Sequence, residues 1–416
     1  MKLAAQPLQL VVTGLLHAGE DTEQTVRTPG YDAPMLITSP HFDETEIEHL
    51  RACLESGWVT QGPLTERFEE LVGERHSARH AIATTSATAA LHLAACALEL
   101  GPGDEVVVPA FTWVTSAHSA EYVGAKAVFT DVSPETFNID TAALEAAITP
   151  RTRAVIAVHL FGLAADMDEI TTIARRHALA VIEDAACAIG TTYKGRPVGV
   201  IGDAGCFSFH PRKVVTTGEG GMLTTNRDDL ASRVSVLRNH GTTGLPDPAE
   251  EAHGPWTMGA FDELGFNLRF SDIQAAVGIA QMRKLDDLLA ERRARGAVYN
   301  ELLADVDGLQ LPTAGPVDGH NYQSYVVRVL EGGRERRNRV MEALADSEIQ
   351  TRPGTHAVHR LGYYRDKYGL EPEDFPNAAL CEDTTITLPI FPSMTDADQE
   401  QVVGVFRRTL AAAPIS

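Results

Sequence analysis

Lysine is scarce in this chain of 416 residues. Only six of its 35 basic side chains are lysines, and the others are arginines. Chemistry that needs an amine able to lose its proton therefore has few candidates. The six lysines are Lys2, Lys126, Lys194, Lys213, Lys284 and Lys367.

Cysteine is also scarce. The five cysteines are odd in number and include no CxxC motif, so the sequence predicts neither a disulfide framework nor a zinc site, and we expect no metal. Free thiols persist in reducing compartments, so the cytoplasm is the expected location. The cysteines are Cys53, Cys96, Cys187, Cys206 and Cys381.

A membrane-spanning run is missing from the N-terminal part of the sequence. Residues 8–16 are mildly apolar, and one lysine precedes them. This stretch is far too short to cross a bilayer, and it lacks the basic start and clean apolar core of a signal peptide. We expect residues 1–36 to form a flexible extension.

Basic charge is in deficit as well. The 57 acidic residues exceed the 35 basic ones, which gives a formal net charge of −22. Such a charge repels phosphate backbones and anionic lipid, so nucleic acid and membrane surfaces are poor partners. No GxGxxG motif follows the first predicted strand and no GxxxxGK[ST] motif occurs, which argues against Rossmann and P-loop chemistry.

What the sequence does contain, from residue 81 onward, is an alternation of short β-type runs with helical stretches. Repeated βαβ units predict an α/β fold with a mainly parallel sheet, flanked by helices, that binds ligands beyond the carboxyl ends of its strands. Because the last predicted strands adjoin without a helix, we expect part of the sheet to be antiparallel. The predicted strands are 81–84, 105–109, 127–131, 154–158, 180–183, 204–208 and 221–225, and the predicted helices are 41–56, 64–74, 87–98, 112–123, 140–148 and 167–177.

The C-terminal third has a different organisation. A long helix is predicted over residues 271–299, and strands are predicted at 320–330 and 386–388. We therefore expect a large domain at residues 37–285, with a seven-stranded sheet, and a smaller α+β domain at residues 286–416.

Two segments carry residues that suit a phosphorylated aromatic ligand. Residues 85–91 join a strand to a helix, where free N–H groups and the helix dipole favour phosphate, although any such junction shares this property. Asp184 follows a buried strand, so it either caps a helix or keeps a pyridine nitrogen protonated. Glu183 is the rival acid, but Asp184 is the one that emerges at the strand end.

A third segment, residues 206–221, places Lys213 five residues after Ser208 among apolar residues and glycines. A lysine amine forms an imine with an aldehyde and then moves a proton between two carbons. The alternative is an ordinary solvated lysine. Residues 218–221 precede a strand, so their glycines predict a turn and not a phosphate cradle.

From about residue 37 to the end, these stretches resemble the DegT/DnrJ/StrS family of sugar aminotransferases, which have the aspartate aminotransferase-like fold of type I pyridoxal 5′-phosphate (PLP) enzymes. The spaced set of motifs is specific, although each part is not. The motifs are Gly57–Pro63, Ser86–Thr88, Pro109–Trp113, Glu183–Ala186, Phe207–Lys213, Gly218–Gly221 and Leu264–Arg269.

The resemblance implies a role for each residue around the ring. Lys213 would hold PLP as the internal aldimine and shuttle protons, and Asp184 would bind the pyridinium nitrogen. Trp113 would stack on the ring, although an ordinary core tryptophan gives the same pattern. Where family members usually have Gln or His this chain has Cys187, a weaker hydrogen-bond donor. Ala87 stands in place of the usual glycine.

The resemblance also implies how the phosphate is held. The backbone amides of Thr88 and Ala89 and the hydroxyl of Ser208 would bind it. Asn267 would reach the phosphate of the neighbouring subunit's cofactor, so that a homodimer shares its active sites. The alternative for Asn267 is a turn residue before the long helix.

The implied reaction moves an amino group from L-glutamate, through the pyridoxamine form of the cofactor, to a nucleotide-linked ketosugar. The pattern is most similar to enzymes acting at C4 of a 4-keto-6-deoxyhexose, with Thr60 and His356 as candidate sugar contacts. An inosose aminotransferase is the nearest alternative. Lys213 counts against the related sugar dehydratases, which have histidine there, and the net charge counts against a DNA-binding regulator.

Overall fold

The computed structural model describes residues 34–244, 256–313 and 319–412, so all but the end of the predicted N-terminal extension lies outside it. Seven strands form one sheet in the order β1-β10-β9-β6-β5-β2-β4. Neighbours from β9 to β4 are parallel, whereas β10 runs antiparallel to β1 and β9, which confirms the predicted mixed sheet. The strands are β1 (His80–Thr84), β2 (Glu105–Pro109), β4 (Lys126–Thr130), β5 (Thr152–Val158), β6 (Ala180–Asp184), β9 (Ala204–Ser208) and β10 (Gly221–Thr225).

Helices cover both faces of this sheet. Successive strand residues point to opposite faces, so Val106 and Val108 of β2 belong to one buried core and Val107 to another. Helices α4, α5 and α8 complete the first core, whereas α3, α7 and α9 complete the second. Their bounds are α3 (Pro63–His76), α4 (Ala87–Ala97), α5 (Thr115–Tyr122), α7 (Met167–His177), α8 (Asp228–Arg238) and α9 (Asp272–Arg283), with α2 (Glu44–Ser56) and α6 (Thr141–Ala147) besides.

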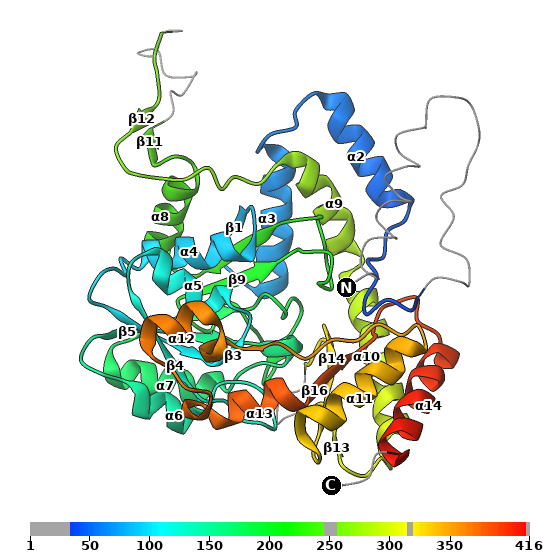
Figure 1. Cartoon of the computed structure of the whole chain (residues 1–416). Coiled ribbons are helices and arrows are strands. Elements are labelled where there is room, and N and C mark those ends of the chain that lie inside the picture. Colours follow the sequence, from blue (N-terminus) through cyan, green and yellow to red (C-terminus); the bar gives the residue numbers. More distant parts are fainter. Residues whose placement is uncertain (1–33, 245–255, 314–318, 413–416) are drawn as a thin grey trace. The chain divides into compact units, whose positions relative to one another are not determined.

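The C-terminal third contains a second, antiparallel sheet in the order β13-β14-β16, with helices beside it (Figure 1). Its predicted strands are confirmed, although the first is shorter than expected. The elements are α10 (Leu285–Leu303), β13 (Leu309–Gln310), β14 (Tyr325–Val329), α11 (Gly333–Asp346), α12 (Gly362–Tyr368), α13 (Pro376–Thr384), β16 (Thr385–Leu388) and α14 (Asp396–Ala412).

The described residues from Leu36 onward form one compact unit. The predicted domain boundary between residues 285 and 286 stays a prediction. A helix break lies beside it, between α9 and α10.

Two helix predictions were wrong in detail. The helix predicted over 271–299 is broken at Lys284, whose N–H donates to the carbonyls of Gln281 and Met282 and so tightens the last turn of α9. The helix predicted to begin at Thr112 begins at Thr115, because Phe111–Thr112 forms strand β3 and pairs with β15 (His356–Ala357). This pairing brings the loop before α12 to the first turn of α5.

Two findings concern the described residues alone. None of their helices is long and apolar enough to span a membrane. They contain no group of three or more His, Cys, Asp or Glu side chains placed to hold a metal ion.

Candidate active site

A cavity of about 830 Å³ lies beyond the carboxyl ends of β5, β6 and β9, where ligands bind in parallel α/β sheets. Its volume suits a small-molecule site. It collects six of the nine residues predicted from the sequence, together with Ser86 at the start of α4. The six are Thr88, Trp113, Asp184, Ser208, Lys213 and His356.

The start of α4 forms one end of this cavity. Ser86 caps the helix, since its Oγ accepts the N–H of Ala89 at 3.1 Å. The N–H groups of Ala87 and Thr88 lie in the first turn, where a helix offers no acceptor, so they and the helix dipole suit a phosphate. Ser208 contributes a hydroxyl from the end of β9. Ala89 does not line the cavity, and its N–H is engaged by Ser86.

Gly221 allows β10 to lie against this helix start. A Cβ atom at Gly221 would lie 2.3 Å from the carbonyl carbon of Ser86 and 2.5 Å from the N atom of Ala87. Both are backbone atoms, so no side-chain rotation relieves the clash. Only glycine fits there, which gives the glycine-rich turn a packing role.

The two candidate acids lie in different environments. Asp184 lines the cavity, where its Oδ2 accepts the hydroxyl of Ser116 at 2.6 Å and its Oδ1 accepts the N–H of Ala186 at 3.2 Å. Glu183 is fully buried outside the cavity lining and accepts from His159 Nε2 at 2.9 Å. The structure therefore places Asp184, and not Glu183, in reach of a ligand.

Glu183 has a structural role instead. Its carboxylate also accepts the N–H groups of Gly199, Ile201 and Gly202 at 2.6–2.7 Å, which fixes the loop before β9. Burial acts to raise the pKa of Glu183, but the hydrogen bonds from His159 and these N–H groups outweigh it and hold the pKa below its usual value. The carboxylate is therefore charged and fully bonded.

Lys213 projects into the cavity from the loop after β9. Its backbone N–H donates to the carbonyl of His210, which closes a turn. Its side-chain Nζ lies 3.1 Å from the Sγ atom of Cys187. Cys187 lies three residues beyond Asp184, so the amine and the acid face one space. The residue that departs from the family pattern thus contacts the lysine directly.

Trp113 and His356 form the outer wall. The pairing of β3 with β15 brings them together, with ring centroids 5.5 Å apart. Both side chains are about half exposed, and the Nδ1 atom of His356 lies 3.9 Å from a Glu382 oxygen. Trp113 is therefore not an ordinary core tryptophan.

Thr60 and Asn267 do not line the cavity. Both are exposed: the carbonyl of Thr60 accepts the N–H of Asp272, and Asn267 forms an isolated bridge with Asn239. Their predicted roles, and those of the other site residues, stay predictions.

Several residues of the site were not predicted from the sequence. Ser116 holds Asp184, and Arg212 and Arg352 line the cavity. Ser116 reads as an ordinary helix residue until the fold brings it to β6. Arg352 begins the segment of residues 352–359, which resembles the sugar-facing loops of the family, but His356 and not Arg352 was the candidate contact predicted there.

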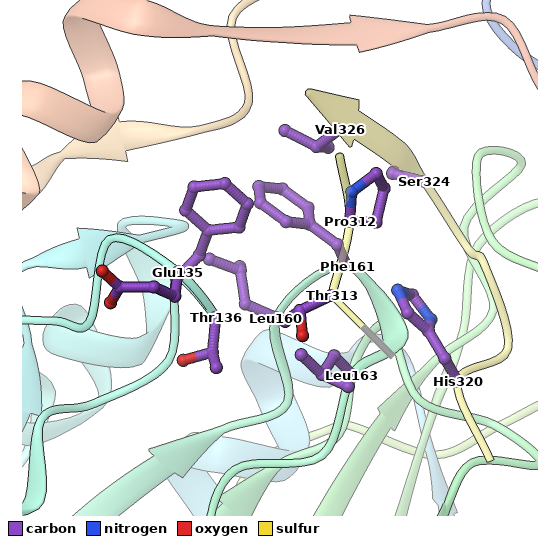
Figure 2. A pocket seen from close by; sticks show the side chains of 11 residues that line it. Glu135, Thr136, Leu160, Phe161, Leu163, Pro312, Thr313, His320, Ser324 and Val326 are labelled. Carbon is purple, nitrogen blue, oxygen red and sulfur yellow. The ribbon is translucent and has the colours of Figure 1, made fainter. Parts of the chain in front are cut away.

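Figure 2 shows a second cavity, between residues 135–137, residues 160–163 and the segment around Pro312 and His320. Its volume is about 10 Å³, room for one water at most. The rings of Phe137 and Phe161, 5.7 Å apart, occupy this region. This cavity is too small for a cofactor or a sugar, so the cavity of about 830 Å³ is the candidate active site.

The residues of the large cavity fit PLP. A helix start with free N–H groups suits its phosphate, a buried carboxylate braced by Ser116 suits its ring nitrogen, and the amine of Lys213 in the same cavity suits its aldehyde. The indole of Trp113 offers a face for the ring.

Comparisons with known proteins agree with this arrangement. The chain is 39% identical over 382 residues to the GDP-perosamine synthase of Caulobacter vibrioides, which covers 91% of this chain and 99% of the relative. The solved aminotransferase from Psychrobacter cryohalolentis has a TM-score of 0.83 at 32% identity, over 90% of this chain and 98% of its own. Spr1654 from Streptococcus pneumoniae, in its PLP form, has a TM-score of 0.84 at 28% identity, over 91% and 99% of the two chains.

These neighbours confirm the predicted type I PLP fold. The model of the DegT/DnrJ/EryC1/StrS aminotransferase family matches residues 40–407. The chain therefore belongs to the DegT/DnrJ/EryC1/StrS aminotransferase family and is a PLP-dependent aminotransferase.

Proposed function

We propose that the protein transfers an amino group from L-glutamate to a nucleotide-linked ketosugar, at C4 of a 4-keto-6-deoxyhexose. The observation that carries the proposal is one cavity of about 830 Å³ that holds both Lys213 and Asp184 and has the half-exposed Trp113–His356 wall beside them. The likeness to a GDP-perosamine synthase, named for a nucleotide-linked amino sugar, supports this acceptor class.

Asp184 and Lys213 would carry the chemistry. PLP, when bound, supplies an electron sink that stabilises negative charge on the carbon being deprotonated. Asp184 would keep the ring nitrogen protonated, and Ser116, bonded to its Oδ2, would fix its orientation. Lys213 Nζ would hold the cofactor's aldehyde carbon and, once released, would take a proton from one carbon and return it to another.

The other predicted contacts would position the ligands. Thr88 and Ser208 would bind the phosphate at the start of α4, and Trp113 would cover the ring face and exclude water. Cys187 lies close enough to Lys213 to accept a hydrogen bond from its amine when that amine is free. His356 would contact the sugar from the outer wall.

We also propose a homodimer with shared active sites, located in the cytoplasm. Asn267 is exposed and outside its own chain's cavity, as a residue that serves the neighbouring subunit would be. The apolar side chains of Trp58 and Leu264, close in sequence to Thr60 and Asn267, are 55% and 92% exposed and would be covered by a partner. All five cysteines are free thiols, which suits a reducing compartment.

The acceptor is tested with the purified protein converted to its pyridoxamine form by L-glutamate. A panel of dTDP-, GDP- and UDP-linked ketosugars and inososes is then offered, and return of the PLP absorbance is recorded. We expect return with a nucleotide-linked 4-keto-6-deoxyhexose. Return with an inosose alone would establish the aminocyclitol alternative instead.

The shared site is tested by subunit mixing. Lys213→Ala and Asn267→Ala homodimers are each expected to be inactive or nearly so, for different reasons. If Asn267 serves the neighbouring site, a mixed dimer places both substitutions in one site and leaves the other intact, so mixing should restore activity. No restoration, after exchange has been shown by mass spectrometry, would contradict the shared site.

A further inference from the structure

Four arginines line the active-site cavity, and they differ in how they are paired. Arg334 donates to Asp383, and Arg337 donates to the carbonyls of Glu382 and Thr385. Arg212 and Arg352 line the same cavity, yet no carboxylate among the described residues lies within ion-pair distance of either guanidinium, and neither side chain donates a hydrogen bond. Two cations of this site are therefore unpaired.

Arg352 is the more unusual of the two. Its Nε atom is buried and has no hydrogen-bond partner. Four other arginines have a buried, unpartnered Nε, but each uses its remaining nitrogens: Arg233 on Glu263, Arg292 on backbone carbonyls, Arg336 on the carbonyl of Leu410 and Arg360 on Glu382 and Asp383. Arg352 is partly buried, and a guanidinium that loses water at Nε without gaining a partner costs free energy that a bound anion would recover.

Hydrogen bonds to backbone carbonyls fix the two chain segments that carry these arginines. Gln323 Nε2 donates to the carbonyl of Arg212 at 2.8 Å, which fixes the loop that carries it, and the carbonyl of Arg352 accepts the N–H of Thr387 at 2.7 Å. Burial lowers the pKa of Arg352, and the neighbouring Arg212 lowers it further. Each cation thus opposes the charge of the other, and an anion between them would relieve the repulsion.

Their place in the cavity narrows the choice of anion. Arg212 adjoins Lys213 in sequence, and all four of Arg212, Arg352, Cys187 and Lys213 line one space. In an α-amino acid the carboxylate is attached to the carbon that carries the reacting amine, so it lies close to Lys213 during reaction. The diphosphate of a nucleotide-linked sugar lies at least a sugar ring away from the reacting carbon.

We propose that Arg212 and Arg352 bind the α-carboxylate of the amino donor. This inference rests on the proposed function, since it requires that the amino group comes from an α-amino acid. Arginine presents its N–H groups in a fork that matches a carboxylate, and one residue on each side would fix the plane of the donor. The role is one of binding and orientation.

The test separates the two half-reactions of the holoenzyme by single-turnover spectroscopy. We expect Arg352→Gln to raise the apparent dissociation constant of L-glutamate about a hundredfold in the first half-reaction, with a smaller change in the limiting rate. The second half-reaction, from the pyridoxamine form with the keto acceptor, should change less than about threefold. Arg352→Lys should recover part of the loss, because it restores the charge but not the fork.

A substrate comparison identifies the carboxylate. The parent enzyme should prefer L-glutamate to its α-amide, isoglutamine, by about a hundredfold, and this preference should nearly disappear in Arg352→Gln. Arg212→Gln should reduce it as well, and its exposed position keeps this variant folded. Arg334→Gln removes the same charge from the same cavity wall, but from a paired cation, and should leave the preference in place.

Three outcomes would overturn the inference. The first is an unchanged preference for L-glutamate over isoglutamine in both Arg352→Gln and Arg212→Gln. The second is a loss of activity confined to the second half-reaction, which would assign the arginines to the acceptor's phosphates. The third is an equal loss of the preference in Arg334→Gln. Failure of the proposed function looks different: the parent enzyme would then react with no α-amino acid, or its pyridoxamine form would react with no nucleotide-linked ketosugar.

Discussion

Glu183 and Asp184 are consecutive in β6, and successive side chains of a strand point to opposite faces of the sheet. One carboxylate therefore reaches the cavity, and the other is enclosed by His159 and three backbone N–H groups. Of these two neighbouring acids, Asp184 is placed to bind a ligand and Glu183 fixes the loop before β9.

This division predicts opposite effects for two similar substitutions. Asp184→Asn should lower kcat by about 10²- to 10⁴-fold, since an amide no longer holds a proton on the ring nitrogen, and should change the free energy of unfolding little. Glu183→Gln should cost about 3 kcal/mol of stability, because its amide group would face buried donors. Steady-state kinetics and urea unfolding measure the two effects, and the reverse assignment would contradict the proposed role of Asp184.

At the scale of secondary structure elements, the close approach of β10 to the start of α4 defines the phosphate end of the site. The gap at Gly221 is smaller than a methyl group requires. This contact joins a strand and a helix that are far apart in the sequence, and it depends on the reversed strand β10 lying between β1 and β9.

Gly221→Ala should therefore displace the Ser86–Ala87 peptide and weaken phosphate binding. We expect PLP affinity to fall at least tenfold and stability to fall by about 1–3 kcal/mol. Equilibrium dialysis and thermal unfolding measure both. Gly362→Ala is the matched control, because nothing lies within 4 Å of a Cβ atom there. Equal behaviour of the two variants would show that the contact is unimportant.

The elements themselves were largely predictable from the sequence. Strands such as β2 and β9 follow from apolar runs between turn residues, and both have the predicted bounds. The break at Lys284 was not predictable, because neither glycine nor proline marks it, and the short strand β3 exists only through its pairing with β15. Local pattern does not report contacts between distant segments.

Among the described residues, three buried histidines lie outside the active-site cavity, His76, His320 and His359, and burial lowers the pKa of each. Burial lowers the pKa of His76 to about 4 and that of His320 to about 3. Both pKa values lie below the usual histidine value of about 6.5. At a pH between these values, the two imidazoles are protonated in the unfolded chain but neutral in the folded chain. The free energy of unfolding therefore falls as the pH drops below about 6.5 toward these values.

We therefore expect the free energy of unfolding to fall by about 4 kcal/mol between pH 7 and pH 5 from His76 and His320. Urea unfolding at fixed cofactor concentration measures this, and His320→Gln should remove about half of the pH dependence. Stability that is constant over this range would contradict the burial of neutral histidines. Below about pH 4.5, protonation of Glu183 should add a further loss, since its folded pKa is depressed.

The site was predictable where it consists of sequence motifs at strand ends. Lys213, Asp184, Ser208 and Trp113 all line the cavity. Ser116, Arg212 and Arg352 were not predicted, because their importance lies in what they contact or fail to contact in the folded chain. The sequence does not show whether an arginine lacks a hydrogen-bond or ion-pair partner, because partners come from distant segments of the folded chain.

The central claim is that Lys213 is the amine that holds PLP. Borohydride reduction of the holoenzyme makes that bond permanent, and peptide mapping by mass spectrometry then locates the adduct among the six lysines. We predict one adduct, on Lys213, and none in Lys213→Ala. An adduct on any other lysine, or an unmodified Lys213 in protein that has bound its cofactor, would contradict the account.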